Sequence, residues 1–425
     1  MANNSVRHFL TKKCLTPFLW LAVSLSATVQ AEPASSYRES EPLRQGGWSR
    51  VVKGGFGDPG IELIGRLVEF KGYFYAATDH KTGGCQIWRS LNGTDWQIVV
   101  GPGAVMPAGF KNPPNPSINE LLAFGDWLFA GTWNQEQGAE LWRSADGLIW
   151  EPVVGGGSAT LSGFGKHENS GITALGGFRG MLFAGTGSLY CKDGVELWRS
   201  KDAGSTWNPV AGERIALRTE MARESKYFLD LAEFKDALYI STGDQRTGGS
   251  EIWSTQDGET WKTVVGPPSP YRAGMGNSND DMIYDLEPFN GSLYAGVLNY
   301  VHDGGALWRS VDGTTWEVIS GDPPAPIAPG FGDAGNMGLV SLAVFDGALY
   351  VGTTNNAGTQ LWRSVDGATW QPVVGQAAAV PAGFGNVHNR AINSLGVFHD
   401  ALYAGAHNPT EGAELWRFET PAQPN

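Results

Sequence analysis

Charged side chains recur at one position of a sequence repeat, and their types could support acid–base chemistry. The position lies four residues before a recurring phenylalanine, found at Phe70, Phe124, Phe178, Phe234, Phe289, Phe345 and Phe398. Its occupants are Arg66, Glu120, Ala174, Asp230, Asp285, Ser341 and Ser394. A glycosidase needs two carboxyl groups that face the scissile bond, and three of these residues carry one. A hydrated structural set of charges explains the pattern equally well at this stage.

A tryptophan marks the repeat that positions these residues. It occurs at Trp88, Trp142, Trp198, Trp253, Trp308, Trp362 and Trp416, with spacings of 54, 56, 55, 55, 54 and 54 residues. In the second copy, the runs 118–124, 127–132, 139–144 and 150–154 are suited to strands, and Gly125-Asp126 and Asp146-Gly147 to tight turns. The sequence therefore predicts an all-β fold, a seven-bladed β-propeller with four antiparallel strands per blade.

The two ends of the repeat array complement each other. The last copy stops after Phe418 without a fourth strand, whereas residues 48–57, WSRVVKGGFG, match the fourth strand and following loop of the other copies. We expect the N-terminal strand to complete the last blade, because this pairing removes an open sheet edge. The predicted domains are a short N-terminal linker at 32–46, the propeller at 47–420 and a C-terminal tail at 421–425.

The first residues predict export. Basic residues at 7, 12 and 13 precede an apolar run at 15–29, and small residues follow up to Ala31. This order is typical of a signal peptide at 1–31 with cleavage near Ala31, so we expect a secreted or periplasmic protein without membrane insertion.

The net charge of -13 makes nucleic acid an unfavourable partner. Cys85 and Cys191 are separated by a whole repeat, so no disulfide is expected, and the protein is expected to be a monomer.

One turn carries a family resemblance. The segment 200–207, SKDAGSTW, resembles the Asp box of the bacterial neuraminidase repeats found in sialidase-like propellers, and contributes Ser200, Asp202, Gly204, Thr206 and Trp207. These residues are expected to be structural, because the aspartate can accept N–H groups of the turn and glycine permits a positive φ. The resemblance implies a ligand site on the opposite face. The chain lacks the Arg-Ile-Pro segment and the three arginines of sialidases, so a typical sialidase is not expected.

The loops opposite the Asp boxes supply the other candidate ligand-binding residues. Together with the channel residue Arg66, they are His167, Asn169, Tyr271, Arg272, His302, Asn336, His388 and Asn389. The asparagines recur three residues before the first strand of a blade. They could bind sugar hydroxyls, but we favour a role in stabilising turns.

Metal binding is expected to be dispensable. No cofactor is required by the sequence, although Asp280 and Asp281 could hold a calcium ion together with nearby carbonyl groups. The histidines are spread over several repeats without a ligand spacing, which disfavours a transition-metal site.

Three functions fit these residues. The first is an exported propeller that binds a ligand, above all a carbohydrate, on the face opposite the Asp boxes. The second is a glycoside hydrolase or lyase that uses Glu120, Asp230 and Asp285, and the third is a non-catalytic scaffold for another exported protein. No nucleophile–base pair, phosphate-binding loop or dinucleotide motif occurs in a suitable context, so binding is favoured over catalysis.

Overall fold

The structure is a computed structural model of the 425-residue chain. It describes residues 36–40, 43–188, 195–211, 225–243, 249–276, 280–299 and 303–420. These residues belong to one compact unit, 33–425. The expected signal peptide, the tail at 421–425, Cys191 and His302 lie outside the described residues.

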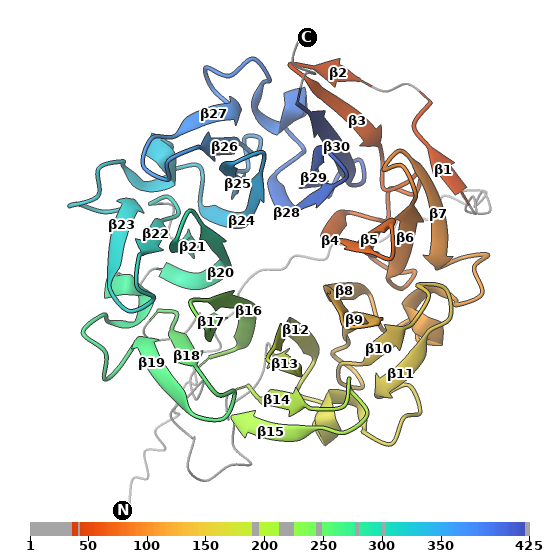
Figure 1. The fold of residues 1–425 in the computed structure, drawn as a ribbon. Helices are drawn as coiled ribbons and strands as arrows, with labels where there is room; N and C mark the ends of the chain where they lie inside the picture. The colour runs from red at the N-terminus through yellow and green to blue at the C-terminus, as the bar shows by residue number, and fades with distance from the viewer. Residues whose placement is uncertain are drawn as a thin grey trace, which may run out of the picture. The chain divides into compact units, whose positions relative to one another are not determined.

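The described strands pair in antiparallel groups of four, which we call blades and number in chain order (Figure 1). The first blade consists of β4 (Leu63–Phe70), β5 (Tyr73–Asp79), β6 (Gln86–Ser90) and β7 (Asp95–Val100). The second consists of β8 (Ser117–Phe124), β9 (Trp127–Trp133), β10 (Leu141–Ser144) and β11 (Glu151–Val154). The third consists of β12 (Gly171–Phe178), β13 (Met181–Gly187), β14 (Leu197–Ser200) and β15 (Asn208–Ala211).

The remaining blades repeat this plan. The fourth consists of β16 (Tyr227–Phe234), β17 (Ala237–Gly243), β18 (Ile252–Thr255) and β19 (Trp261–Val265). The fifth consists of β20 (Asp280–Phe289), β21 (Ser292–Asn299), β22 (Leu307–Ser310) and β23 (Trp316–Ser320). The sixth consists of β24 (Gly338–Phe345), β25 (Ala348–Thr354), β26 (Leu361–Ser364) and β27 (Gln371–Val374). The last contains β28 (Ala391–Phe398), β29 (Ala401–His407) and β30 (Glu414–Glu419).

The first strand of each blade lies innermost, and these strands form a ring around the centre of the molecule in Figure 1, a central region that we call the channel. Innermost strands of successive blades contact each other, and β28 contacts β4. The prediction of an all-β propeller of antiparallel strands is confirmed by this arrangement. Among the described residues, no helix is both long and apolar enough to cross a membrane.

The N-terminal segment contributes to two blades. Strand β3 (Trp48–Val52) pairs antiparallel with β30, with Trp48 opposite Phe418. The short strand β2 (Arg44–Gln45) pairs with β3, while β1 (Ser36–Arg38) pairs with β7 of the first blade. The segment therefore spans the outer edges of the last and first blades.

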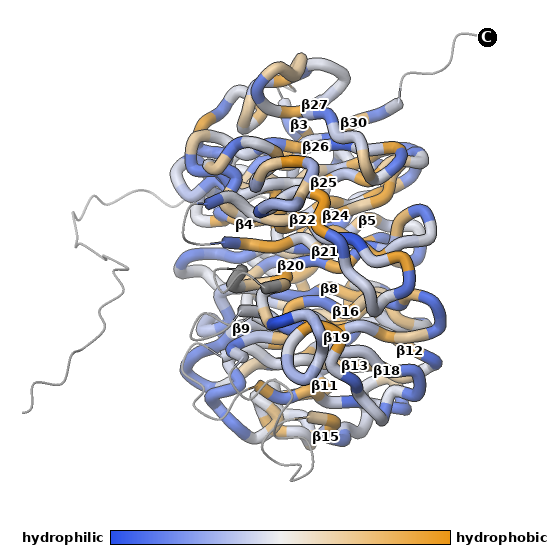
Figure 2. Tube along the Cα trace, turned by 90° about the vertical axis from the view of Figure 1, so that its left-hand side faces the viewer, coloured by the Kyte–Doolittle hydropathy of each residue, from blue (hydrophilic) through white to orange (hydrophobic). Residues whose placement is uncertain are grey.

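Aromatic stacking joins five of the blades to the loop before them. Most of these loops contain a short 3-10 turn, namely η1 (Ala108–Lys111), η2 (Ser162–Gly165), η3 (Ala273–Gly276), η4 (Pro329–Gly332) and η5 (Ala382–Gly385). In η2, Phe164 stacks on Trp198 of the third blade, with ring centroids 4.5 Å apart and planes 7° apart. The same stacking is made by Phe110, Phe331 and Phe384, and by Phe56 on Trp88. Such pairs bury large apolar areas between blades, and hydrophobic residues recur along the strands in Figure 2.

The turn at 200–207 has the hydrogen bonds expected of it. An Asp202 carboxylate oxygen accepts the Thr206 N–H at 2.8 Å, and the Ser200 hydroxyl accepts the Gly204 N–H at 2.8 Å. Gly204 has a φ of 88°. Trp207 packs edge-on against Phe164, at a centroid distance of 5.4 Å. These contacts hold the turn between the third and fourth strands, on the side away from the loops considered below.

Candidate functional site

The channel residues are positioned by irregularities in the innermost strands. In β4 the register shifts between Ile64 and Arg66, and in β20 between Ile283 and Asp285. The corresponding shift occurs in the other innermost strands as well. A bulge re-aims the side chain beside it, and here it directs the residue four before the phenylalanine towards the neighbouring blade.

Several of these side chains join one innermost strand to the next. The Asp230 carboxylate accepts the Leu286 N–H at 2.7 Å, and the Asp285 carboxylate accepts the Leu342 N–H at 2.8 Å. Serine makes the equivalent link with reversed polarity, since the Ser394 hydroxyl donates to the Ile64 carbonyl oxygen at 2.6 Å. Ser341 donates in the same way to the carbonyl oxygen of Ile392. Both aspartates proposed as catalytic candidates therefore also hold blades together.

Arg66 and Glu120 form a two-point ion pair across the channel wall. Nη2 of Arg66 lies 2.5 Å from Oε1 of Glu120, and Nε lies 3.2 Å from Oε2. The Arg66 side chain remains 36% exposed, so water reaches it within the channel although protein surrounds it. Burial raises the pKa of Glu120 to about 7, against the opposing effect of the arginine. Glu120 is therefore close to its titration point at neutral pH.

Three further acidic residues, Asp230, Asp285 and Glu287, have raised pKa values as well. Burial raises the pKa of Asp230, and a hydrogen bond with Asp285 opposes that rise. Burial and the charge of Asp230 raise the pKa of Asp285 well above its usual range. Burial, followed by the charge of Asp230, raises the pKa of Glu287 to about 8. One arginine thus interacts with three carboxyl groups, Glu287 lies near Asp230, and burial favours protonated carboxyl groups in the channel.

Sequence reasoning missed Glu287. It lies two residues before the recurring phenylalanine, where the copies carry Val68, Leu122, Gly176, Ala232, Glu287, Ala343 and Gly396. Successive side chains alternate between the faces of a strand, so Glu287 lies on the same face as Asp285. The sequence does hold a signal for this residue: among the seven copies, Glu287 is the single carboxylate at a position two residues before the phenylalanine that is otherwise apolar.

An aromatic and apolar cluster lies beside the acidic groups, at the end of the channel away from the Asp boxes. We call it the channel-mouth cluster, and it consists of Trp133, Tyr227, Leu229, Met282, Tyr284, Leu298, Met337 and Val340. Trp133 and Tyr227 lie 6.2 Å apart between ring centroids. The Trp133 ring covers Gly171, where an added Cβ would lie 2.3 Å from the ring.

Two tyrosines belong to the channel-mouth cluster, and the charge of Arg66 acts on one of them, Tyr284. Burial raises the pKa of Tyr284, and the Arg66 charge opposes this rise. Burial also raises the pKa of Tyr227, and the neighbouring Tyr284 adds to the rise. Tyr284 directly precedes Asp285 in β20, so the cluster and the carboxylates share one strand. The arrangement combines partly exposed aromatic faces with hydrogen-bonding groups, as sites for small polar ligands commonly do.

Comparisons with known proteins found two curated relatives that match most of this chain. A xyloglucanase of Hypocrea jecorina is 26% identical over 395 residues, and a xyloglucanase of a Paenibacillus species is 27% identical over 403 residues. These matches cover 83% and 86% of this chain but only 42% and 35% of the relatives. The chain thus spans about two fifths of the length of the curated relatives that it matches. No family model matches the chain.

Solved structures with the same fold support the propeller architecture. The GH74 xyloglucanase of Xanthomonas campestris superposes with a TM-score of 0.51 at 19% identity, over 86% of this chain and 54% of that one. YCF48 of Cyanidioschyzon merolae superposes with a TM-score of 0.53 at 11% identity, over 88% of this chain and 99% of that one. At such low identity, these similarities describe the fold alone.

The three candidate asparagines are used inside the protein. Asn169, Asn336 and Asn389 are at most 1% exposed. The Asn389 amide donates to the Gly383 carbonyl oxygen at 2.9 Å and to the Glu414 carboxylate at 2.7 Å. Asn169 makes the same two kinds of bond, and Asn336 donates to the carbonyl of Gly330. Their amides are not available to a ligand in this structure, in keeping with the turn-stabilising interpretation.

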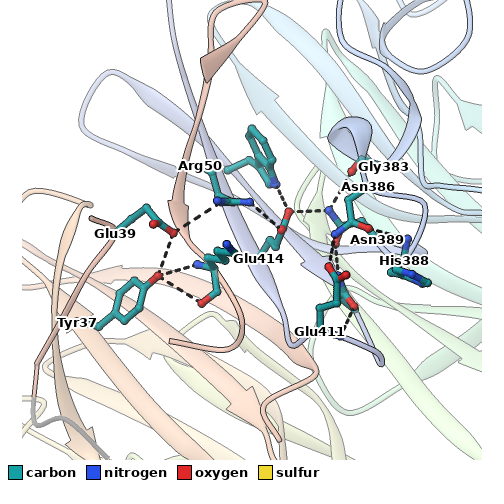
Figure 3. Close-up of polar contacts among 12 residues, drawn as sticks. Tyr37, Glu39, Arg50, Gly383, Asn386, His388, Asn389, Glu411 and Glu414 are labelled. Atoms are coloured by element: carbon teal, nitrogen blue, oxygen red, sulfur yellow. Dashed lines mark hydrogen bonds and ion pairs between the residues drawn. The ribbon is translucent and has the colours of Figure 1, made fainter. Parts of the chain in front are cut away.

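Figure 3 shows this network in the last blade, where the N-terminal segment reinforces it. Glu414 accepts hydrogen bonds from Asn389, from the Trp416 indole and from Arg50, the last at 3.2 Å. Arg50 also lies 3.7 Å from Glu39. The polar contacts therefore connect β3 and β30 with the residue that follows β1, beside a pocket that Arg50, Glu414 and Trp416 help to line.

The other predicted loop residues differ in their exposure. His167 is exposed and lies 3.2 Å from Glu168, whereas His388 is half-buried. Tyr271 is half-buried against the core between the fourth and fifth blades, and Arg272 is exposed. The side chains of Asp280 and Asp281 lie outside the described residues. Within the described part of the chain, no three His, Cys, Asp or Glu side chains gather closely enough to hold a metal ion.

Proposed function

We propose that this chain is an exported β-propeller that binds a neutral polysaccharide at the channel mouth. The proposal includes seven blades, closure of the last blade by β3, the relation to Asp-box propellers and a signal peptide at 1–31. The observation that carries it is the channel-mouth cluster beside Arg66 and the carboxyl groups. Aromatic faces pack against the C–H groups of sugar rings, while carboxylates and tyrosine hydroxyls bond the sugar hydroxyls.

The relatives suggest which polysaccharide to test first. Both are named xyloglucanases. We infer that xyloglucan is a ligand to test first for this chain. The chain matches only part of each relative, so the complete activity of those proteins does not transfer to it directly.

Glycoside hydrolysis is the second candidate. It is favoured by Glu120 and Glu287, whose pKa values of about 7 and 8 keep a proton available for a leaving group at neutral pH. The inter-blade bonds of Asp230 and Asp285 count against it, because they give these carboxylates a structural task. Binding therefore remains the main proposal.

The experiment measures binding and cleavage of the same glycans. Residues 32–425 are applied to a glycan array that includes xyloglucan oligosaccharides, and bound glycans are examined by mass spectrometry for cleavage. The variant Trp133→Ala is expected to weaken binding at least tenfold. Trp127→Ala, at the other end of β9, is the matched control and should bind as the wild type does.

The outcomes separate the candidates. Binding without cleavage supports a lectin function. Cleavage by the wild type that is lost in Glu120→Gln supports the glycoside hydrolase function instead. Absence of binding to every glycan overturns the proposal and favours a scaffold for an exported protein. A parallel series with a chelator tests the proposed calcium ion at Asp280 and Asp281, since dependence on that ion predicts weaker binding after chelation.

A further inference from the structure

A polar contact recurs beneath the tryptophan of the third strand. The residue two positions earlier is a glutamate or glutamine whose oxygen accepts the indole N–H at 2.9 to 3.2 Å. The pairs are Gln86–Trp88, Glu140–Trp142, Glu196–Trp198, Glu251–Trp253, Gln360–Trp362 and Glu414–Trp416. This side chain fills the space beside the indole in each of these blades.

The fifth blade breaks the pattern twice. Ala306 replaces the glutamate or glutamine, and Trp308 Nε1 is buried without a hydrogen-bond partner. Among the third-strand tryptophans of the described chain, it is the one without an acceptor. Met275 takes the place of the phenylalanine that stacks on the indole in five other blades. Both replacements lie around the same indole.

A cavity of about 260 Å³ lies at this position, and we call it the blade-five pocket. Its apolar wall includes Trp308, Met275, Val318 and Pro323. Asp303 and Asp322 add carboxyl groups at exposed positions of the lining. A single water occupies about 30 Å³ of liquid, so the pocket has room for a small ring as well as for water.

The lining restricts the chemistry of an occupant. The two aspartates favour hydrogen-bond donors and repel anions. A neutral hydroxyl group can donate to these carboxylates. The apolar wall then favours a compact ring with C–H groups over a fully solvated chain.

We propose that the blade-five pocket binds one neutral sugar residue, such as a side branch or chain end of a polysaccharide. The sugar ring packs on Trp308 and Met275, and its hydroxyls donate to the carboxylates. The inference shares the carbohydrate class of the proposed function but assigns a second site, outside the channel.

The test titrates the full chain with a xyloglucan oligosaccharide by calorimetry, and compares Ala306→Gln with the wild type. The new glutamine refills the pocket and supplies the acceptor found in the first and sixth blades. We expect binding at the pocket to weaken at least tenfold, while the melting temperature stays equal or rises. Gln360→Ala, which makes the reverse change in the sixth blade, is the control and should leave pocket binding unchanged.

A second readout does not depend on the stability of a variant. The Trp308 indole N–H resonance, assigned from its loss in Trp308→Phe, is expected to shift when the oligosaccharide is added. Unchanged binding in Ala306→Gln together with an unshifted resonance overturns the inference. Loss of binding in Trp133→Ala alone would then still support the channel site, whereas loss in Ala306→Gln alone supports the pocket without the channel.

Discussion

Glu287 shows how one residue can break the symmetry of a repeat. Other copies place aliphatic residues or glycine at this position, which suits a surface packed between neighbouring innermost strands. Burial raises the pKa of Glu287 to about 8, so the native protein holds a proton that the unfolded chain releases near the ordinary value of 4.5. Its contribution to stability is complete below that ordinary value and is lost as the pH rises through about 8.

The first prediction concerns the pH dependence of this contribution. Glu287→Gln should leave the melting temperature at pH 4.5 nearly unchanged and raise it at pH 8.5, because glutamine needs no buried charge. The expected gain at pH 8.5 is roughly 2–4 kcal/mol in the free energy of unfolding. Thermal unfolding of both proteins across this range measures it.

The control is Glu233→Gln, at an exposed position of the fourth innermost strand. Its melting temperature should differ from that of the wild type by the same small amount at both pH values. The pH dependence of each variant is compared with that of the wild type, because His407 changes the stability of every one of these proteins with pH in the opposite direction to Glu287. Burial lowers the His407 pKa to about 4, so its contribution is lost as the pH falls below 6.5. Equal pH profiles for Glu287→Gln and the wild type would contradict the argument.

At the scale of the strand, the Arg66–Glu120 pair joins β4 to β8. Removing the arginine leaves a buried carboxylate without its partner, which costs more than the loss of the pair as a whole. Arg66→Met should therefore lower the free energy of unfolding at pH 8 by about 1–3 kcal/mol, a value reduced for the partial exposure of Arg66. Adding Glu120→Gln should recover part of that loss.

A double-mutant cycle in urea measures the coupling between the two residues. We expect at least about 1 kcal/mol for Arg66–Glu120. The comparison pair is Arg143–Glu151, whose atoms lie 2.7 Å apart across β10 and β11 but whose glutamate is 52% exposed. Its coupling should stay below about 1 kcal/mol. Additive effects at Arg66 and Glu120 would show that the ion pair does not stabilise the channel.

The sequence predicted the strands well because their signals are local. Alternating apolar runs recur in each copy and Asp-Gly turns in several copies, and they match the strands and turns of the structure. The bulges were not predictable, because a one-residue shift leaves the apolar pattern almost intact. For this reason, the sequence placed Asp230 at the channel but gave no sign of its bond to the Leu286 N–H. The roles of buried asparagines depend likewise on partners more than 20 residues away, such as Glu414 for Asn389.

At the scale of the whole molecule, the N-terminal segment links the two ends of the repeat array. Strand β3 supplies four residues that pair with β30, and Trp48 is buried against the last blade. Ser394 adds a bond from β28 to β4 on the channel side of the same junction. The outer and inner edges of this junction are therefore both bonded, and stability should depend on the segment that carries β3.

The final prediction compares two truncations of the expected mature chain. Removing residues up to 42 deletes β1 but keeps β3, whereas removing residues up to 52 deletes β3 and leaves the edge of β30 unpaired. We expect the shorter deletion to change the melting temperature by only a few degrees. The longer deletion should lower it by more than about 10 °C and promote self-association, because an unpaired strand edge binds other chains.

Calorimetry and light scattering measure both effects, and adding a peptide of residues 43–57 should restore a monomer. If the longer truncation remains monomeric with an unchanged melting temperature, the β3–β30 pairing does not secure the propeller.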